Sequence, residues 1–399
     1  MLGRGSLSMK KIYLDHGATT PVSSEVLDAM IDIYKQEAGN PSSVHQFGRS
    51  AKKHLEAARV KVANAIGADP KEIIFTGSGT EADNMAVIGT ARLKAKQGKG
   101  KHIITSSIEH HAVLDTCKAL AKEGFEITYL PVDEFGVVSA ADVREALRPD
   151  TILVTIMHAN NEVGTIQPIA EIGQILKEHQ AVFHTDAVQT VGKVPVDVNE
   201  LQVDMLTVSA HKIYGPKGVG ALYMRKGIRI EPLMYGGGQE RKIRPSTENL
   251  AGIVGFAVAI EKAVEELAVE KQRLETLRDK LIDDILQTIP ETKLNGHPTE
   301  RLPHNANVSF EYIEGESLIL SLDMKGIAVS SGSACTSGSL DPSHVLMAMG
   351  LSHQTAHGSL RMTLGKATTE EDIDYVVSVL KDVAARLREM SPVWEQRNK

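Results

Sequence analysis

The sequence predicts an α/β fold in which a mostly parallel central sheet has helices on both faces, joined to a smaller α+β domain. Short apolar runs alternate with helical patterns between about residues 70 and 225, and this alternation is typical of βαβ units. Polar side chains follow several of the runs, where strands are expected to end. After Pro290 the pattern changes to short strands and a closing helix over about 369–390, which indicates the second, smaller unit.

The individual elements follow from the hydrophobic period and from the residues that start or stop each segment. Ser23 or Ser24 can cap a helix that runs to about Tyr34, and a helix over about 50–66 carries apolar residues at helical spacing. Further helices are expected near Thr80, near Glu109 and, with a break, over about 251–289, whereas the glycine-rich segment 236–249 is expected to be a loop. The expected strands are 12–16, 73–76, 102–106, 125–132, 152–157, 181–186, 203–208 and 220–224.

Composition narrows the possible class of protein. The 399 residues are 42% hydrophobic and 24% charged with a net charge of -7, which is ordinary for a globular protein and gives no support for a nucleic-acid or membrane surface. Cys117 and Cys335 are too few for a disulfide framework or for a metal site built from thiolates alone. We therefore expect a cytoplasmic protein, and we interpret residues 1–8 as an added leader before a natural start at Met9.

A glycine turn, Gly77-Ser-Gly-Thr80, lies between an expected strand and an expected helix. Glycines allow close backbone approach to a ligand, and the free N–H groups of a helix start bind phosphate. An ordinary capped turn explains the same residues equally well.

Lys212 stands directly after the apolar run 203–208, in Ser209-Ala-His-Lys. A lysine at the end of a buried strand is either exposed to solvent or reactive, and a reactive amine can bind an aldehyde cofactor covalently. Asp186 ends an earlier strand in the same way. A phosphate turn, a carboxylate and a lysine are the parts that pyridoxal phosphate needs, whereas a dinucleotide site would explain the glycines but not the lysine.

Two further features involve residues that could carry chemistry. His110 and His111 are adjacent, so they would point in different directions on a helix, which argues against a shared metal ion. Cys335 lies in a run of small residues that predicts an exposed, mobile loop, where a thiolate could attack and carry sulfur. An incidental surface cysteine is the alternative. Cys117, among apolar helix residues, is expected to be structural.

Six sequence motifs occur here in the same order as in one known protein family. The resemblance to that family extends from about Tyr13 to Arg388. The motifs are Tyr13-Leu-Asp-His-Gly-Ala-Thr-Thr-Pro, Ile108-Glu-His-His-Ala-Val, Met157-His-Ala-Asn-Asn-Glu-Val-Gly, His184-Thr-Asp-Ala-Val-Gln, Ser209-Ala-His-Lys and Ser330-Ser-Gly-Ser-Ala-Cys-Thr-Ser-Gly-Ser. The chain resembles the cysteine desulfurases of the NifS/IscS type, in the class V aminotransferase-like group. The resemblance implies the pyridoxal-phosphate-dependent transferase fold type I. The implied domains are a segment 1–20 that packs with the small domain, a large cofactor-binding domain 21–255 and a small domain 256–399 that carries the Cys335 loop.

The resemblance also implies roles at matching positions. Lys212 would hold the cofactor covalently, Asp186 would pair with its ring nitrogen, and His110 would stack on the ring and move protons. Gln189 would bond the ring hydroxyl, with Asn161 nearby. The phosphate would be held by Gly79, Thr80, Ser209, His211 and, from the other subunit of a homodimer, Thr247. Arg361 and, with weaker support, Asn40 would bind the substrate carboxylate.

The implied reaction removes sulfur from L-cysteine to give L-alanine and a persulfide on Cys335. No metal ion is required, although Cys335 could transiently ligate a cluster iron. The sulfur acceptor stays open between an iron-sulfur scaffold protein, a tRNA-thiolation relay and nitrogenase supply, because the tail 390–399 departs from the scaffold-binding tail of the IscS type. The alternatives are a selenocysteine lyase, a class V transaminase, or an inactive sulfur-relay or assembly platform.

Overall fold

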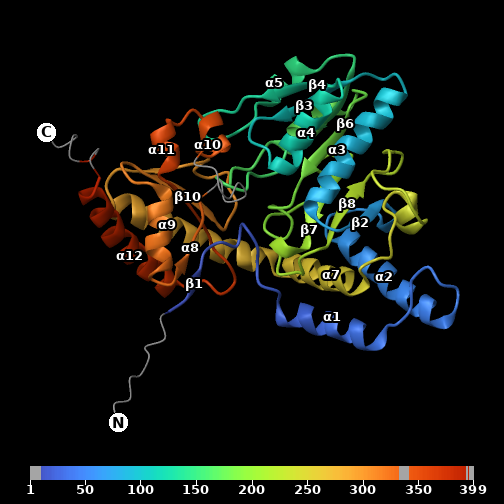
Figure 1. Cartoon of the computed structure of the whole chain (residues 1–399), viewed down its shortest axis with the longest axis horizontal. Helices are drawn as coiled ribbons and strands as arrows, with labels where there is room; N and C mark the ends of the chain where they lie inside the picture. Colours follow the sequence, from blue (N-terminus) through green and yellow to red (C-terminus); the bar gives the residue numbers. More distant parts are fainter. Residues whose placement is uncertain (1–9, 332–340, 392–393, 395–399) are drawn as a thin grey trace, which may run out of the picture. The chain divides into compact units, whose positions relative to one another are not determined.

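The computed structural model describes residues 10–331, 341–391 and 394, and these residues form two compact units (Figure 1). The larger unit consists of Thr19–Asn161 and Thr165–Val269. The smaller unit consists of the described parts of Met1–Ala18, Glu162–Gly164 and Glu270–Lys399.

The larger unit is built on a seven-stranded sheet in the order β2-β8-β7-β6-β5-β3-β4. Only β8 runs antiparallel to its neighbours, β2 and β7, so the expectation of a mostly parallel sheet is confirmed. The strands are β2 (Ile73–Thr76), β3 (His102–Ser106), β4 (Glu126–Leu130), β5 (Thr151–Thr155), β6 (Val182–Asp186), β7 (Met205–Ser209) and β8 (Gly220–Met224).

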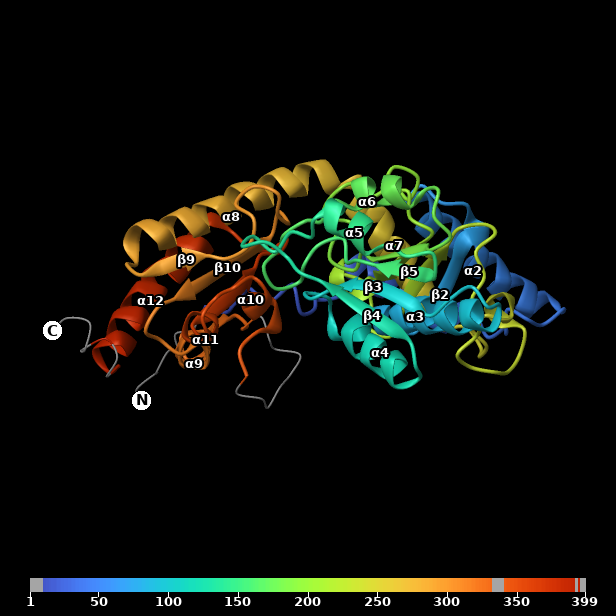
Figure 2. The same ribbon diagram turned by 90° about the horizontal axis from the view of Figure 1, so that it is seen from above.

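Helices cover both faces of this sheet, with α3 and α4 on one face and α5, α6 and α7 on the other (Figure 2). The alternation of side chains along each strand explains the two layers, because successive residues point to opposite faces. In β6, Phe183 joins the apolar core on the α7 side and Val182 joins the core on the α3 side. The helices are α1 (Ser24–Gln36), α2 (Gln46–Asn64), α3 (Gly79–Lys96), α4 (His111–Lys122), α5 (Ala140–Ala146), α6 (Ile169–Leu176) and α7 (Leu250–Glu265), with single 3₁₀ turns η1 (Pro70–Glu72), η2 (Ala210–Lys212) and η3 (Gln239–Lys242).

The smaller unit contains an antiparallel three-stranded sheet in the order β12-β10-β9 and a parallel pair, β1 and β11. One apolar core joins these strands to α8, α9 and α12. The elements are β1 (Ile12–Tyr13), α8 (Leu267–Thr288), β9 (Thr292–Leu294), β10 (Asn305–Phe310), α9 (Gly315–Asp323), β11 (Ile327–Ala328), α10 (His344–Ala348), α11 (His353–His357), β12 (Ser359–Thr363) and α12 (Glu370–Glu389).

Some element and unit boundaries differ from those expected from the sequence. Helix α2 starts four residues earlier than residue 50, because the His45 side chain accepts a hydrogen bond from the Gly48 N–H and caps the helix. The expected division at residue 256 falls inside α7, which packs against α1 and α2, so the larger unit continues to Val269. The helical segment expected over about 251–289 is interrupted at Glu266; a break was expected in this segment, but its position was not predicted. None of the described helices is long and apolar enough to cross a membrane.

A buried ion pair fixes the loop that precedes α7. Glu240 accepts two hydrogen bonds from the Arg59 guanidinium, at 2.9 and 2.7 Å, and a third from the Phe75 N–H at 2.8 Å. Three consecutive residues of this loop, Glu240, Arg241 and Lys242, have positive φ angles of 39°, 58° and 66°. Such left-handed backbone is costly for residues other than glycine, so the buried pair must offset that cost.

We expect Glu240→Gln to lower the free energy of unfolding by about 3–5 kcal/mol, because it removes the buried partner of Arg59 and leaves only the half-exposed Glu56, at 3.3 Å, to balance the charge. Urea denaturation of the protein with and without the substitution measures this. Glu123→Gln is the matched control, since Glu123 pairs with Arg92 at the surface and exposed pairs contribute about 1 kcal/mol or less. Equal losses in the two variants would contradict the anchoring role of Glu240.

Candidate active site

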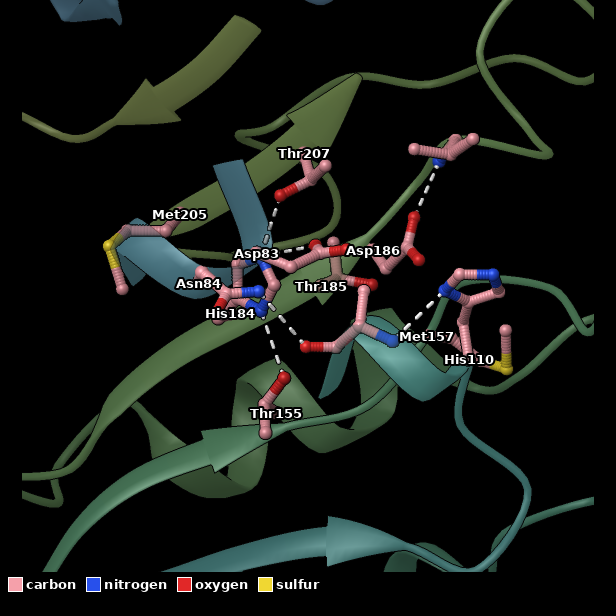
Figure 3. Close-up of polar contacts among 12 residues, drawn as sticks. Asp83, Asn84, His110, Thr155, Met157, His184, Thr185, Asp186, Met205 and Thr207 are labelled. Carbon is pink, nitrogen blue, oxygen red and sulfur yellow. Dashed lines mark hydrogen bonds and ion pairs between the residues drawn. The ribbon is translucent and has the colours of Figure 1, made fainter. Parts of the chain in front are cut away.

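Most of the polar residues singled out from the sequence gather at one edge of the large sheet. Asp186 ends β6 and Ser209 ends β7, while His110 lies between β3 and α4. Because β3, β5, β6 and β7 are parallel, their carboxyl ends meet at the same edge, which is where α/β sheets bind ligands. Figure 3 shows the polar contacts around Asp186 and His110.

Lys212 is the last residue of the 3₁₀ turn η2, directly after β7. This turn is fixed by Thr20, whose hydroxyl donates to the His211 carbonyl at 3.0 Å and accepts from the Tyr214 N–H at 2.7 Å. Lys212 is half-buried, and its charge lowers the pKa values of both Asp186 and His211. The lysine therefore lies within electrostatic reach of the Asp186 carboxyl. Thr20 had not been expected to take part, because nothing in its spacing links it to Lys212.

Asp186 is a carboxyl placed at a buried position, 7% exposed. Burial raises its pKa to about 6, while a hydrogen bond from the Val188 N–H at 2.9 Å and the charge of Lys212 act in the opposite direction. A cationic ligand group beside Asp186 would stabilise the ionised form, so the position suits a protonated ring nitrogen.

His110 caps α4, and its Nδ1 accepts a hydrogen bond from the Ala112 N–H at 3.1 Å. This contact places the proton of the neutral ring on Nε2. His111 has a different partner, since its Nδ1 lies 3.4 Å from a carboxylate oxygen of Asp115, and the expectation that the two histidines point in different directions is confirmed. The preceding residue, Glu109, is fully buried, and burial raises its pKa to about 8.

The glycine turn before α3 fits a phosphate group. Ser78 caps the helix by accepting from the Glu81 N–H at 3.1 Å, which leaves other N–H groups of the first turn directed outward. Any side chain at Gly79 would come within 2.9 Å of Val188 and 3.4 Å of the Ser209 Cβ, so only glycine brings the turn so close to β7. The Ser209 hydroxyl is buried and has no hydrogen-bond partner in the described parts of the chain. A buried hydroxyl without a partner is costly, and a phosphate oxygen would satisfy it.

Two other groups adapt this turn to an anion. Arg244 binds Glu81 through two contacts of 2.7 and 3.3 Å, and so neutralises the carboxylate in the first turn of α3. The His211 Nδ1 lies 3.1 Å from the Thr19 hydroxyl. Burial and, to a smaller extent, the charges of Lys212 and Lys217 together lower the pKa of His211 to about 4, so the ring is neutral near pH 7. The Arg244–Glu81 pair was not predicted, because no sequence pattern connects residues so far apart.

The other predicted residues lie in several environments. Gln189 is buried and Asn161 is half-buried, whereas Thr80, Thr247 and Asn40 are exposed. The Asn40 side chain accepts from the Ser42 N–H at 2.9 Å. Arg361 belongs to the smaller unit, where its guanidinium donates to Asp15 at 2.9 Å and its backbone pairs with Ser330. Cys335 lies outside the described residues, whereas Cys117 is buried in an apolar core, as expected.

Comparisons with known proteins agree with the resemblance seen in the sequence. The family described as aminotransferase class-V matches residues 12–376. The chain is 55% identical over 388 residues to cysteine desulfurase IscS of Methanosarcina thermophila, covering 97% of this chain and 95% of that protein. A solved NifS-like protein superposes with a TM-score of 0.89 at 42% identity, covering 95% of this chain and all of the other. The structure described as SspA in complex with cysteine is 39% identical, with a TM-score of 0.79, and covers 89% and 99% of the two chains.

We expect Ser209→Ala to weaken pyridoxal phosphate binding by about tenfold, the effect of losing one charge-assisted hydrogen bond. The same variant should slightly stabilise the cofactor-free protein, because it removes a buried hydroxyl without a partner. Cofactor titration and urea denaturation of the cofactor-free protein measure the two effects. A loss of stability together with unchanged affinity would contradict this role for Ser209.

Proposed function

Because this chain belongs to the cysteine desulfurases of the aminotransferase class-V family, we propose that it removes sulfur from L-cysteine, releases L-alanine and carries the sulfur as a persulfide on Cys335. The single observation that carries the proposal is the meeting of Lys212, Asp186 and the α3 turn at one sheet edge. Its direct test is incubation of the purified protein with L-cysteine and a thiol, followed by measurement of alanine and sulfide. Equal amounts of the two products are expected, and alanine formation without sulfide would contradict the proposal.

Pyridoxal phosphate is the cofactor of this family, and when bound it withdraws electrons from the substrate α-carbon. We propose that Lys212 holds it covalently, that Asp186 pairs with its ring nitrogen and that His110 stacks on the ring. Gln189 and Asn161 would bind near the ring hydroxyl. For the phosphate we propose Gly79, Thr80, Ser209, His211 and, from a partner subunit, Thr247. The buried Ser209 hydroxyl and the close packing at Gly79 support this assignment.

Two side chains are assigned the proton transfers of the reaction: Lys212 removes a proton and His110 donates one. Lys212, once free, takes the proton from the substrate α-carbon, a role supported by its half-buried position next to Asp186. His110 can donate from Nε2, since its Nδ1 is occupied by the Ala112 N–H. The substrate carboxylate is assigned to Arg361, a planar donor suited to two parallel hydrogen bonds, with Asn40 as a second group.

Sulfur transfer is assigned to Cys335. Its thiolate attacks the substrate sulfur, a sulfur–sulfur bond forms, and the bond between the substrate Cβ and sulfur breaks. Protonation at Cβ then completes alanine. The persulfide sulfur passes to an acceptor, for which we propose an iron-sulfur scaffold protein or another sulfur-transfer protein.

We further propose a cytoplasmic homodimer. Four exposed side chains of the larger unit, Tyr34, Val44, Phe47 and Tyr235, are between 66% and 88% exposed. Large apolar groups exposed to this degree are typical of surfaces that bind another protein. Thr247 is also exposed, which is compatible with its completing the phosphate site of the partner. The small number of cysteines supports a reducing compartment.

We expect Lys212→Ala to lose the absorbance band of the lysine-bound cofactor and to lower alanine production by at least about 10²–10⁴-fold, the usual contribution of a general base. Absorbance spectra and amino-acid analysis measure the two effects. Lys217→Ala is the control, because Lys217 is exposed in the same segment and has no assigned role. Turnover at the native rate by the Lys212 variant would exclude it as the base.

We expect Cys335→Ala to keep the cofactor spectrum and to form no persulfide, because no other residue is assigned the attack on sulfur. Persulfide can be detected by mass spectrometry after incubation with L-cysteine. Cys117→Ala should still form the persulfide, since burial raises the pKa of the Cys117 thiol to about 12. Sulfide release at the native rate from the Cys335 variant would favour a different nucleophile. A native protein that makes no persulfide but exchanges amino groups would be a transaminase.

A further inference from the structure

A chain of four buried polar side chains lies on the α3 side of the sheet, next to Asp186 (Figure 3). The His184 ring is at its centre, with Nδ1 at 2.9 Å from the Thr155 hydroxyl and Nε2 at 3.0 Å from the Thr207 hydroxyl. Figure 3 also shows the contact between His184 Nε2 and Asp83 Oδ1 of α3, and a hydrogen bond to Thr207 acts on the Asp83 carboxyl. All four residues are at most 1% exposed, so solvent does not satisfy any of them. The chain thus links β5, β6, β7 and α3.

The strand geometry connects this chain to the cofactor carboxylate. His184 and Asp186 are two residues apart in β6, so their side chains share a face of the sheet. Thr207 is the partner of Asp186 in the register between β6 and β7. Asp83 and Asp186 are therefore two buried acids on adjoining elements. Two neighbouring buried carboxyls strongly resist ionising together.

The contacts of Asp83 indicate which acid keeps the proton. Its Oδ1 has no hydrogen-bond partner among the described residues and lies 3.7 Å from His184 Nε2. An ionised carboxylate with a buried, unbonded oxygen would be costly. Asp186, in contrast, accepts the Val188 N–H and is close to Lys212. An ion pair between Asp83 and His184 is also unfavourable, because two buried charges without a direct hydrogen bond do not recover their desolvation cost.

The number of hydrogens available for these hydrogen bonds then determines which ring nitrogen of His184 carries the proton. Each threonine hydroxyl has one hydrogen and a neutral imidazole has one N–H. If Asp83 is protonated and donates to Thr207, the Thr207 hydroxyl must donate to His184 Nε2, and His184 Nδ1–H donates to Thr155. If Asp83 is ionised, every bond in the chain reverses and His184 carries its proton on Nε2.

We propose that Asp83 is a positioning residue for the cofactor: it holds a proton that fixes His184 in the Nδ1–H form and leaves Asp186 to carry the negative charge opposite the ring nitrogen. The inference rests on the proposed function only in taking Asp186 as the partner of pyridoxal phosphate. The acids and bases that face Asp83 agree with it. Burial and the charges of Asp186 and Glu109 raise the pKa of Asp83, against the hydrogen bond to Thr207, and burial lowers the pKa of His184 to about 3.

A second buried histidine provides an internal control. His102 also lies between two threonines, with Nδ1 at 2.7 Å from the Thr151 hydroxyl and Nε2 at 2.8 Å from the Thr128 hydroxyl. It begins β3, at the opposite end of the strand from the cofactor edge, and within the described residues neither threonine hydroxyl is bonded to a carboxyl group. Thr207→Val and Thr151→Val therefore each remove a threonine hydroxyl that contacts a buried histidine. Only the hydrogen-bond chain of Thr207 continues to Asp83.

The proton positions can be measured directly on the cofactor-loaded protein near pH 7. Nitrogen-15 NMR should show His184 neutral and protonated at Nδ1, and an imidazolium or an Nε2–H ring would overturn the proposal. The infrared difference between the native protein and Asp83→Asn should contain the carbonyl band of one buried, protonated carboxylic acid. Absence of that band would also overturn the proposal. Asp83→Asn should keep the Nδ1–H form of His184, because its amide can donate to Thr207 as the acid does.

The link to the cofactor is tested by affinity. Thr207→Val should weaken pyridoxal phosphate binding by about tenfold, whereas Thr151→Val should change it less than twofold. Equal effects of the two variants would show that the chain has only a structural role, which contradicts the proposal. None of these measurements needs turnover. A protein that binds the cofactor but releases no sulfur would therefore contradict the proposed function without affecting the inference about Asp83.

Discussion

The burial of an ionisable carboxyl at the end of β6 is the constraint on which the rest of the site depends. Asp186 is 7% exposed and burial raises its pKa, so its negative charge exists only if neighbouring groups stabilise it. The Val188 N–H and Lys212 act in that direction. In the proposed function, a cationic ring nitrogen beside Asp186 would stabilise this charge further. The carboxylate would in turn stabilise the protonated ring.

The sheet topology brings the glycine turn before α3 to the same edge of the sheet as this carboxylate. Strand β8 runs antiparallel to β2 and β7, so β2 points the same way as the parallel strands and delivers the start of α3 to their carboxyl edge. Glycines permit this close approach. A side chain at Gly220 would come within 2.7 Å of the Val208 carbonyl and 2.8 Å of the Ser78 backbone. The antiparallel strand β8 thus lies between β2 and β7 without reversing the direction of β2, and Gly220 lets it pass close to the turn before α3.

Sequence patterns predicted the fold class and the strand-end residues, because hydrophobic period and strand direction are local properties. Asp186 and Ser209 end strands that the pattern located to within a few residues, and Lys212 follows the second of them. The Glu240–Arg59 and Glu81–Arg244 pairs join residues more than 160 positions apart, and no local pattern reports such contacts. His184 was missed as part of a polar chain for another reason. It lies inside an apolar strand, where a single polar residue gives no sign of its partners on β5, β7 and α3.

In the smaller unit, as in the larger one, a buried charged side chain is stabilised by a neighbouring group of opposite charge. Arg361 is 3% exposed, and its guanidinium is paired with Asp15 in the Tyr13-Leu-Asp-His motif. The pair offsets part of the cost of burying the arginine charge. Asp15 itself is only partly buried, and its hydrogen bond fixes the orientation of the guanidinium. The two proposals therefore share one feature: Asp15 would orient Arg361 for the substrate carboxylate, and protonated Asp83 would leave the negative charge on Asp186 for the cofactor ring.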